Sequence, residues 1–145
     1  MHRGQPAQDA LHVTFRDFLR LLRQIDTWLI APALLVVIYG ELAHSDVVNI
    51  LESNVWDKAL HFTAYFGLCF MTTIAARNYR GASWFALGLV VLGGALEIIQ
   101  GYTGRDCDIY DEIANSIGVV CGFCAAWSAV AILKVLKLVA DAPPD

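Results

Sequence analysis

Long apolar stretches alternate with short polar segments along most of the chain. Four such stretches cover residues 27–43, 58–76, 83–100 and 113–139, and the last is densest up to residue 133. A helix needs roughly 20 apolar residues to cross the hydrocarbon core of a membrane, with a range of about 17–25. The backbone has to be helical there because lipid offers no hydrogen-bond partners. The pattern therefore predicts an all-α integral membrane protein, a bundle of four transmembrane helices.

The first apolar stretch is the least regular of the four. Pro32 interrupts it, and Glu41 lies near its end. A cleaved signal peptide is the alternative interpretation of this segment. The apolar run starts unusually late for a signal peptide and no clean A-x-A cleavage site follows it, so the sequence favours a membrane span.

Residues 10–25 show a different, amphipathic pattern. Three arginines lie off a stripe of apolar residues spaced three and four apart, namely Leu11, Phe15, Phe18, Leu22 and Ile25. A basic amphipathic helix of this kind lies flat in the interface of an anionic leaflet. We predict such an interfacial helix, with an ordinary helix packed on the bundle as the alternative. The predicted organisation is a basic tail and amphipathic helix over residues 1–25, a membrane domain over residues 26–140 and a tail over residues 141–145.

The composition agrees with a membrane protein and excludes other classes. The chain is 57% hydrophobic and only 17% charged, whereas soluble domains are usually about 45–50% apolar and about 25% charged. These values also exclude a disordered chain. Ten basic residues against 14 acidic ones argue against binding to nucleic acid. The partner that the composition indicates is the lipid bilayer.

The basic residues predict how the chain is oriented. Eight of the ten lie on the side of the membrane that is predicted to hold both termini: Arg3, Arg16, Arg20, Arg23, Arg77, Arg80, Lys134 and Lys137. Only Lys58 and Arg105 fall on the other side. Cytoplasmic segments carry the excess of Lys and Arg. We therefore expect a multi-pass protein with both termini cytoplasmic and two loops outside.

Polar residues gather at the outer ends of the predicted helices. Asp57, His61 and Tyr65 are four residues apart, so they share one face of a helix. Glu97 and Gln100 lie at the outer end of the predicted helix over residues 83–100, in the same layer. The whole candidate binding site is Asp57, Lys58, His61, Tyr65, Glu97, Gln100, Arg105, Asp108, Asp111 and Asn115.

This set of side chains allows several chemistries. Carboxylates with one imidazole suit a divalent metal ion, and the candidate ligands are Asp57, His61, Glu97 and Asp111. The basic residues Lys58, His61 and Arg105 suit a phosphate group, which arginine can bind through two hydrogen bonds. A buried Glu97 can also carry a proton. The structural alternative is that Glu97 pairs with Lys58 or Arg105 and joins the helices. No nucleophile elbow, HExxH motif or phosphate-binding loop is present, so no reaction is assigned.

Small residues in the spans have structural interpretations. Gly118 and Gly122 form a G-x-x-x-G pair, which predicts close packing within the bundle, with homodimerisation as the alternative. Cys121 and Cys124 have C-x-x-C spacing, but they lie inside a predicted span, where thiols behave as small apolar residues.

The polar residues also follow a familiar order. The pattern Asp57-Lys58-x-x-His61-x-x-x-Tyr65, then Glu97-x-x-Gln100, then Arg105 and Asp108-x-x-Asp111-x-x-x-Asn115-x-x-Gly118 resembles the VanZ-like membrane protein family. The similarity covers roughly residues 27–135 and leaves out the arginine-rich N-terminal helix. It implies a small multi-spanning bundle of the bacterial cytoplasmic membrane, and it supplies no reaction and no reason to assign antibiotic resistance.

Three functions are consistent with this pattern. The first is an outward-facing site that binds, and can process or move, an anionic lipid or phosphorylated cell-envelope precursor. The second is a non-enzymatic assembly or accessory protein whose polar layer is structural and whose basic N-terminal helix docks a partner. A transporter of protons or small ions is the third. It is disfavoured because the inner halves of the spans carry almost no ionisable residues to complete a path.

Overall fold

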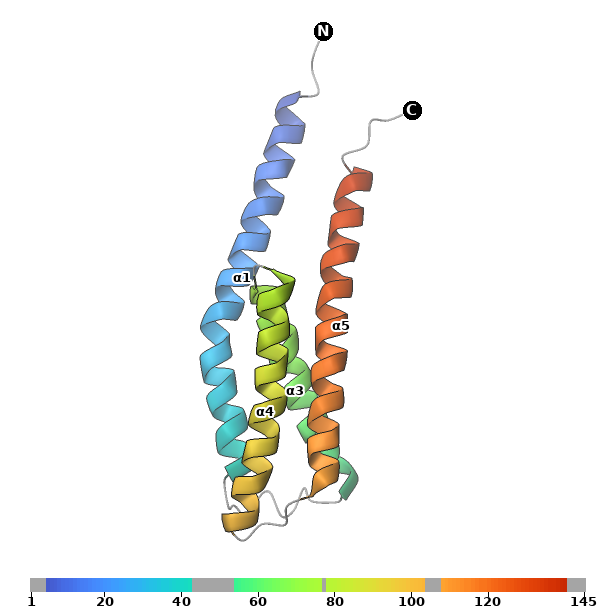
Figure 1. The fold of residues 1–145 in the computed structure, drawn as a ribbon. Helices are drawn as coiled ribbons and strands as arrows, with labels where there is room; N and C mark the ends of the chain where they lie inside the picture. Colours follow the sequence, from blue (N-terminus) through green and yellow to red (C-terminus); the bar gives the residue numbers. More distant parts are fainter. Residues whose placement is uncertain (1–4, 43–53, 77, 104–107, 141–145) are drawn as a thin grey trace.

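The structure, a computed structural model, describes residues 5–42, 54–76, 78–103 and 108–140. Within these ranges the chain forms helices and no strand: α1 Gln5–Leu42, α3 Asn54–Ala75, α4 Tyr79–Thr103 and α5 Ile109–Ala140. The helices run side by side in alternating directions, so α1 begins and α5 ends at the same end of the bundle (Figure 1). The prediction of an all-α protein is confirmed.

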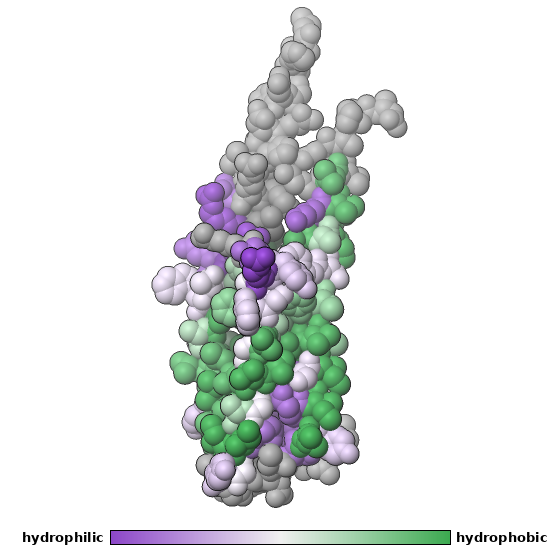
Figure 2. All heavy atoms as spheres, viewed as in Figure 1, coloured by the Kyte–Doolittle hydropathy of each residue, from purple (hydrophilic) through white to green (hydrophobic). Residues whose placement is uncertain are grey.

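Three of these helices are long and apolar enough to cross a membrane, over Arg20–Leu42, Tyr79–Tyr102 and Ile109–Leu136. Figure 2 shows a broad band of apolar side chains on the visible face of the bundle, with polar side chains gathered above and below it. Helix α3 is not one of the three, although its 22 residues extend about 33 Å. Its polar residues Lys58 and His61 face other helices rather than lipid, as described below. The apolar surface shows a membrane protein.

Helix α1 does not confirm a separate N-terminal interfacial helix. It is one helix of 38 residues, about 57 Å long, and Pro32 lies inside it. Residues 10–25, for which we predicted a separate interfacial helix, form its first part and continue directly into the apolar segment. The domain boundary predicted at residue 25 therefore lies within a continuous helix. Together with α5, α1 extends beyond the other two helices (Figure 1).

The closest helix packing is between α3 and α5, and glycine makes it feasible. A Cβ atom on Gly118 would collide with the backbone oxygen of Phe62, and one on Gly122 with that of Phe66. Small residues let membrane helices approach to backbone contact. The G-x-x-x-G pair thus packs within the bundle, as predicted. We call this contact the glycine seam.

The remaining core is small and apolar. Its buried residues are Tyr65, Leu68, Cys69, Leu89 and Val119. The other two described thiols, on Cys121 and Cys124, are exposed on α5 and are not in a disulfide. Most large apolar side chains lie on the outside of the bundle, and its interior holds polar groups at one end. We call the end where α1 and α4 end and α3 and α5 begin the polar end.

Candidate functional site

An ion pair joins α3 to the start of α5. The ammonium group of Lys58 donates to Asp108 Oδ2 at 2.7 Å and to Asp111 Oδ1 at 3.0 Å. Asp108 also caps α5, because its other oxygen accepts from the backbone N–H of Tyr110 at 2.9 Å. Both contacts hold the pKa of the Asp108 carboxyl below its ordinary value, the Lys58 hydrogen bond having the larger effect. The two aspartates therefore already neutralise the charge of Lys58.

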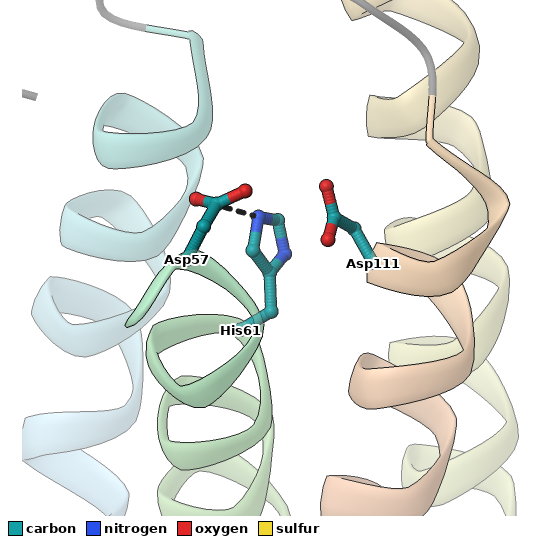
Figure 3. Close-up of side chains that lie close together, drawn as sticks. All are labelled: Asp57, His61 and Asp111. Carbon is teal, nitrogen blue, oxygen red and sulfur yellow. Dashed lines mark ion pairs between the residues drawn. The ribbon is translucent and has the colours of Figure 1, made fainter. Parts of the chain in front are cut away.

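The imidazole of His61 is buried among groups from three helices. Its Nδ1 lies 3.1 Å from Asn115 Oδ1 and 3.7 Å from Glu41 Oε1. Its Nε2 lies 3.9 Å from Asp57 Oδ1, one helical turn earlier on α3. Asp57 and His61 face Asp111 across the space between α3 and α5 (Figure 3). The face predicted from the spacing of Asp57 and His61 is thus directed toward the other helices.

Helix α4 closes the polar end with Glu97 and Gln100, each only 3% exposed. One carboxylate oxygen of Glu97, Oε2, accepts from the backbone N–H of Asp108 at 3.3 Å. The other, Oε1, is buried and has no hydrogen-bond partner among the described residues. Gln100 donates to the backbone oxygen of Glu41 at 2.8 Å. Among the described residues, Glu97 is therefore one of the polar side chains whose hydrogen-bonding capacity is partly unused, as is the hydroxyl of Tyr65.

A glycine on α4 makes room for this cluster. A Cβ atom on Gly93 would lie 2.6 Å from Glu112 Oε2, 3.0 Å from Asn115 Nδ2 and 3.3 Å from the hydroxyl of Tyr65. Glu112 in turn accepts from Asn115 Nδ2 at 3.4 Å. Three polar side chains therefore converge beside Gly93, and an added Cβ atom would require the Glu112 side chain to shift.

The structure brings together nine of the ten predicted site residues. The tenth, Arg105, lies outside the described residues. Two further members, Glu41 and Glu112, were not predicted as site residues. Their sequence signals were an acid at the end of an apolar span and an acid in the first turn of α5, next to Asp111. The described polar end thus holds one lysine ammonium group and six carboxyl groups, those of Glu41, Asp57, Glu97, Asp108, Asp111 and Glu112.

The family follows from a comparison with known protein families. The family model described as VanZ/LLP1 matches residues 5–134. The chain belongs to the VanZ/LLP1 family. The match begins well before residue 27, so the arginine-rich part of α1, which the sequence resemblance left out, lies within the family region. Neither the comparison with curated proteins nor the one with solved structures found a match.

Every described member of the polar cluster in this VanZ/LLP1 protein lies within the matched region. Three of the four predicted metal ligands, Asp57, His61 and Asp111, each offer one ligand atom, and these atoms lie within 4.8 Å of one another. Glu97 is not one of that group. The cluster can accept many hydrogen bonds and can bind a cation, whereas Lys58 offers little free positive charge to an anion.

Proposed function

We propose that this VanZ/LLP1 protein binds the headgroup of an anionic lipid or phosphorylated envelope precursor at its polar end. The observation that carries the proposal is the buried, partly unbonded carboxylate of Glu97 within a layer of polar side chains at the end of apolar helices. Ionisable groups within membrane spans cost free energy and are functional candidates by default. A lipid can place its headgroup in such a layer while its acyl chains stay in the bilayer.

The chemistry of the layer restricts which headgroups fit. Carboxylates accept hydrogen bonds, so Glu97 suits a headgroup that offers hydroxyl, amine or amide donors. A phosphate has no free ammonium group to meet, because Lys58 already binds Asp108 and Asp111. The phosphate therefore needs a further positive charge, from a cation or from a residue of the loop that contains Arg105. The proposed ligand is a phosphorylated amphiphile with hydrogen-bond donors in its headgroup.

The proposed orientation follows from the exposed arginines and lysines that lie toward the end where α1 begins and α5 ends, whereas Lys58 lies at the polar end. Arg20, Arg23, Arg80 and Lys134 are all exposed. By the positive-inside rule this end is cytoplasmic, which requires α3 to act as a fourth span in the bacterial inner membrane. The polar end then faces outward. A C-terminal green fluorescent protein fusion should fluoresce, and a C-terminal alkaline phosphatase fusion should be inactive; the opposite pattern would reverse the orientation.

The test is native mass spectrometry of protein extracted gently from its own membrane. We expect the wild type to retain a phosphorylated lipid. Glu97→Gln should lose the lipid while keeping its helix content and melting temperature, and Asp111→Asn should lose it while keeping its helix content. Asp17→Asn is the control, because Asp17 is an exposed acid on α1 far from the polar end. A wild type that carries no lipid, or variants that retain as much as the wild type, would contradict the proposal.

A second candidate is an accessory protein whose polar layer is structural. It is favoured by the satisfied contacts between helices, such as those from Lys58 to α5 and from Gln100 to α1. In that case Glu97→Gln should lower the melting temperature and expression, and the wild type should retain no lipid. The same experiment thus separates the two candidates.

A further inference from the structure

The group of Asp57, His61 and Asp111 has the dimensions of a small cation site. Its three ligand atoms lie within 4.8 Å of one another. Two ligands on opposite sides of a divalent ion are about 4.2–4.8 Å apart when each bond is about 2.1–2.4 Å long. A small movement of the Asp57 side chain, which is 22% exposed, would bring the three atoms to bonding distance around one ion.

The hydrogen bonds of Asn115 fix which nitrogen of His61 carries the proton. Asn115 Nδ2 faces a carboxylate oxygen of Glu112 and has to donate to it, so Oδ1 is the atom that faces His61 Nδ1. Nδ1 must then be the donor of that 3.1 Å bond. In a neutral imidazole this leaves Nε2 with a lone pair. That lone pair lies 3.9 Å from a carboxylate oxygen of Asp57, so two electron-rich atoms face each other at a distance that a cation would bridge.

A second observation comes from α4. Glu97 is 3% exposed, and its Oε1 lacks a partner among the described residues. A buried carboxylate oxygen without a donor is costly unless a cation or a ligand satisfies it. The other oxygen of this carboxylate accepts from the backbone N–H of Asp108, so Glu97 brings an unused oxygen from a third helix to the same polar end.

We propose that Asp57, His61 and Asp111 bind a first-row divalent cation, such as Mn²⁺ or Zn²⁺, with Glu97 beside it. An imidazole among carboxylates favours these ions over Ca²⁺ and Mg²⁺, which prefer oxygen ligands alone. The Nδ1 contact to Asn115 orients the ring, as outer hydrogen bonds of metal-binding histidines generally do. The cation's role as a bridge to a phosphate rests on the proposed function, whereas binding of the ion by these side chains does not.

The test measures Mn²⁺ binding to the full chain in nanodiscs of zwitterionic phosphatidylcholine. Free Mn²⁺ gives an electron paramagnetic resonance signal that is lost on binding, and a bound imidazole adds a nitrogen coupling in pulsed spectra. We expect one Mn²⁺ per chain, displaced by Zn²⁺, with nitrogen coupling in the wild type. Asp57→Asn should weaken binding at least tenfold, and His61→Gln should remove the coupling. Asp17→Asn should bind as the wild type does.

Folding of the variants is checked by their melting temperatures without the ion, and binding is checked by whether the ion raises these temperatures. Binding to the folded state alone stabilises it by mass action, so Mn²⁺ should raise the melting temperature of the wild type and of Asp17→Asn but not that of Asp57→Asn. Absence of saturable binding, or equal affinity in Asp57→Asn, would overturn the cation site.

A second arm separates the cation site from the proposed function. Anionic lipid is added to the nanodiscs, and its retention on the chain is measured with and without a chelator. Mn²⁺ binding without lipid retention would support the cation site and contradict the proposed function. Lipid retention that the chelator does not change, together with no Mn²⁺ binding, would support the function and overturn the cation site.

Discussion

Helices α3 and α5 meet in two neighbouring regions that are built in opposite ways. In the glycine seam, Gly118 and Gly122 pack directly on the backbone of α3. At the polar end, one turn away, the same two helices are joined by Lys58 and His61 facing Asp111 and Asn115. The seam depends on shape alone, whereas the polar end depends on charge and hydrogen bonds.

The two regions differ in whether their polar groups find hydrogen-bond partners within the chain. The seam leaves no polar group exposed, because its contacts involve helix backbone that is already hydrogen-bonded. The polar end holds more carboxyl groups than the described cations can neutralise, and Glu97 Oε1 has no donor there. Apolar packing would join the helices as well as a buried ion pair does, and often better. A purely structural role therefore explains the seam more fully than it explains the polar end.

The largest expected effect comes from filling the seam. Gly122→Leu should prevent the bundle from folding, because a branched side chain cannot enter where even a Cβ atom meets the backbone of Phe66. Gly122→Ala should lower stability by about 1–3 kcal/mol, the usual range for overpacking. Thermal unfolding in detergent, followed by circular dichroism, measures both variants.

The matched control for the seam is Gly88 on α4. A Cβ atom there has nothing within 4 Å, and alanine favours a helix over glycine by about 1 kcal/mol. Gly88→Ala should therefore fold as well as the wild type does or better. If Gly122→Ala behaved like Gly88→Ala, the seam would not be the shape-dependent contact described here.

An intermediate effect is expected from removing the cation of the polar end. Lys58→Met should lower the melting temperature by several degrees, because it leaves Asp108 and Asp111 without their partner. Removing one member of a part-buried ion pair is worse than removing both. The double variant Lys58→Met/Asp111→Asn should therefore be more stable than Lys58→Met alone. If the melting temperature of the double variant fell by the sum of the two single decreases, the ion pair would not couple the helices.

The sequence predicts the seam better than the polar end, for a physical reason. Apolar length and the G-x-x-x-G spacing are local along one helix, so they can be found without knowing the neighbours. The face shared by Asp57 and His61 is local in the same sense. That Glu41 meets His61 depends on how α1 is rotated and placed against α3, and no spacing within either helix contains that information.

The separate N-terminal helix predicted for residues 10–25 is not confirmed, because these residues belong to the longer helix α1. Helices usually stop at glycine, proline or a capping residue, and the segment from Arg23 to Trp28 contains neither glycine nor proline. The pattern along α1 changes from amphipathic to apolar, but the backbone hydrogen bonds of the helix continue through this point. A change of hydropathy alone was therefore insufficient evidence for a helix end.

The smallest expected effect is the pH dependence of the contact between Lys58 and Asp108. The folded state lowers the pKa of Asp108 below its ordinary value of 3.8, so this contact stabilises the fold above pH 3.8 and the stabilisation is lost as the pH falls further. Asp108→Asn still accepts the capping hydrogen bond from Tyr110 but carries no charge. The wild type should melt slightly higher than this variant by a constant margin between about pH 7 and pH 5, and the margin should shrink below pH 3.8. Because all other carboxyl groups titrate in both proteins, the difference between the two curves isolates this one. Curves that stay parallel into the acid range would show that the contact contributes no charge-dependent stability, and that the polar end is joined through Asp111 instead.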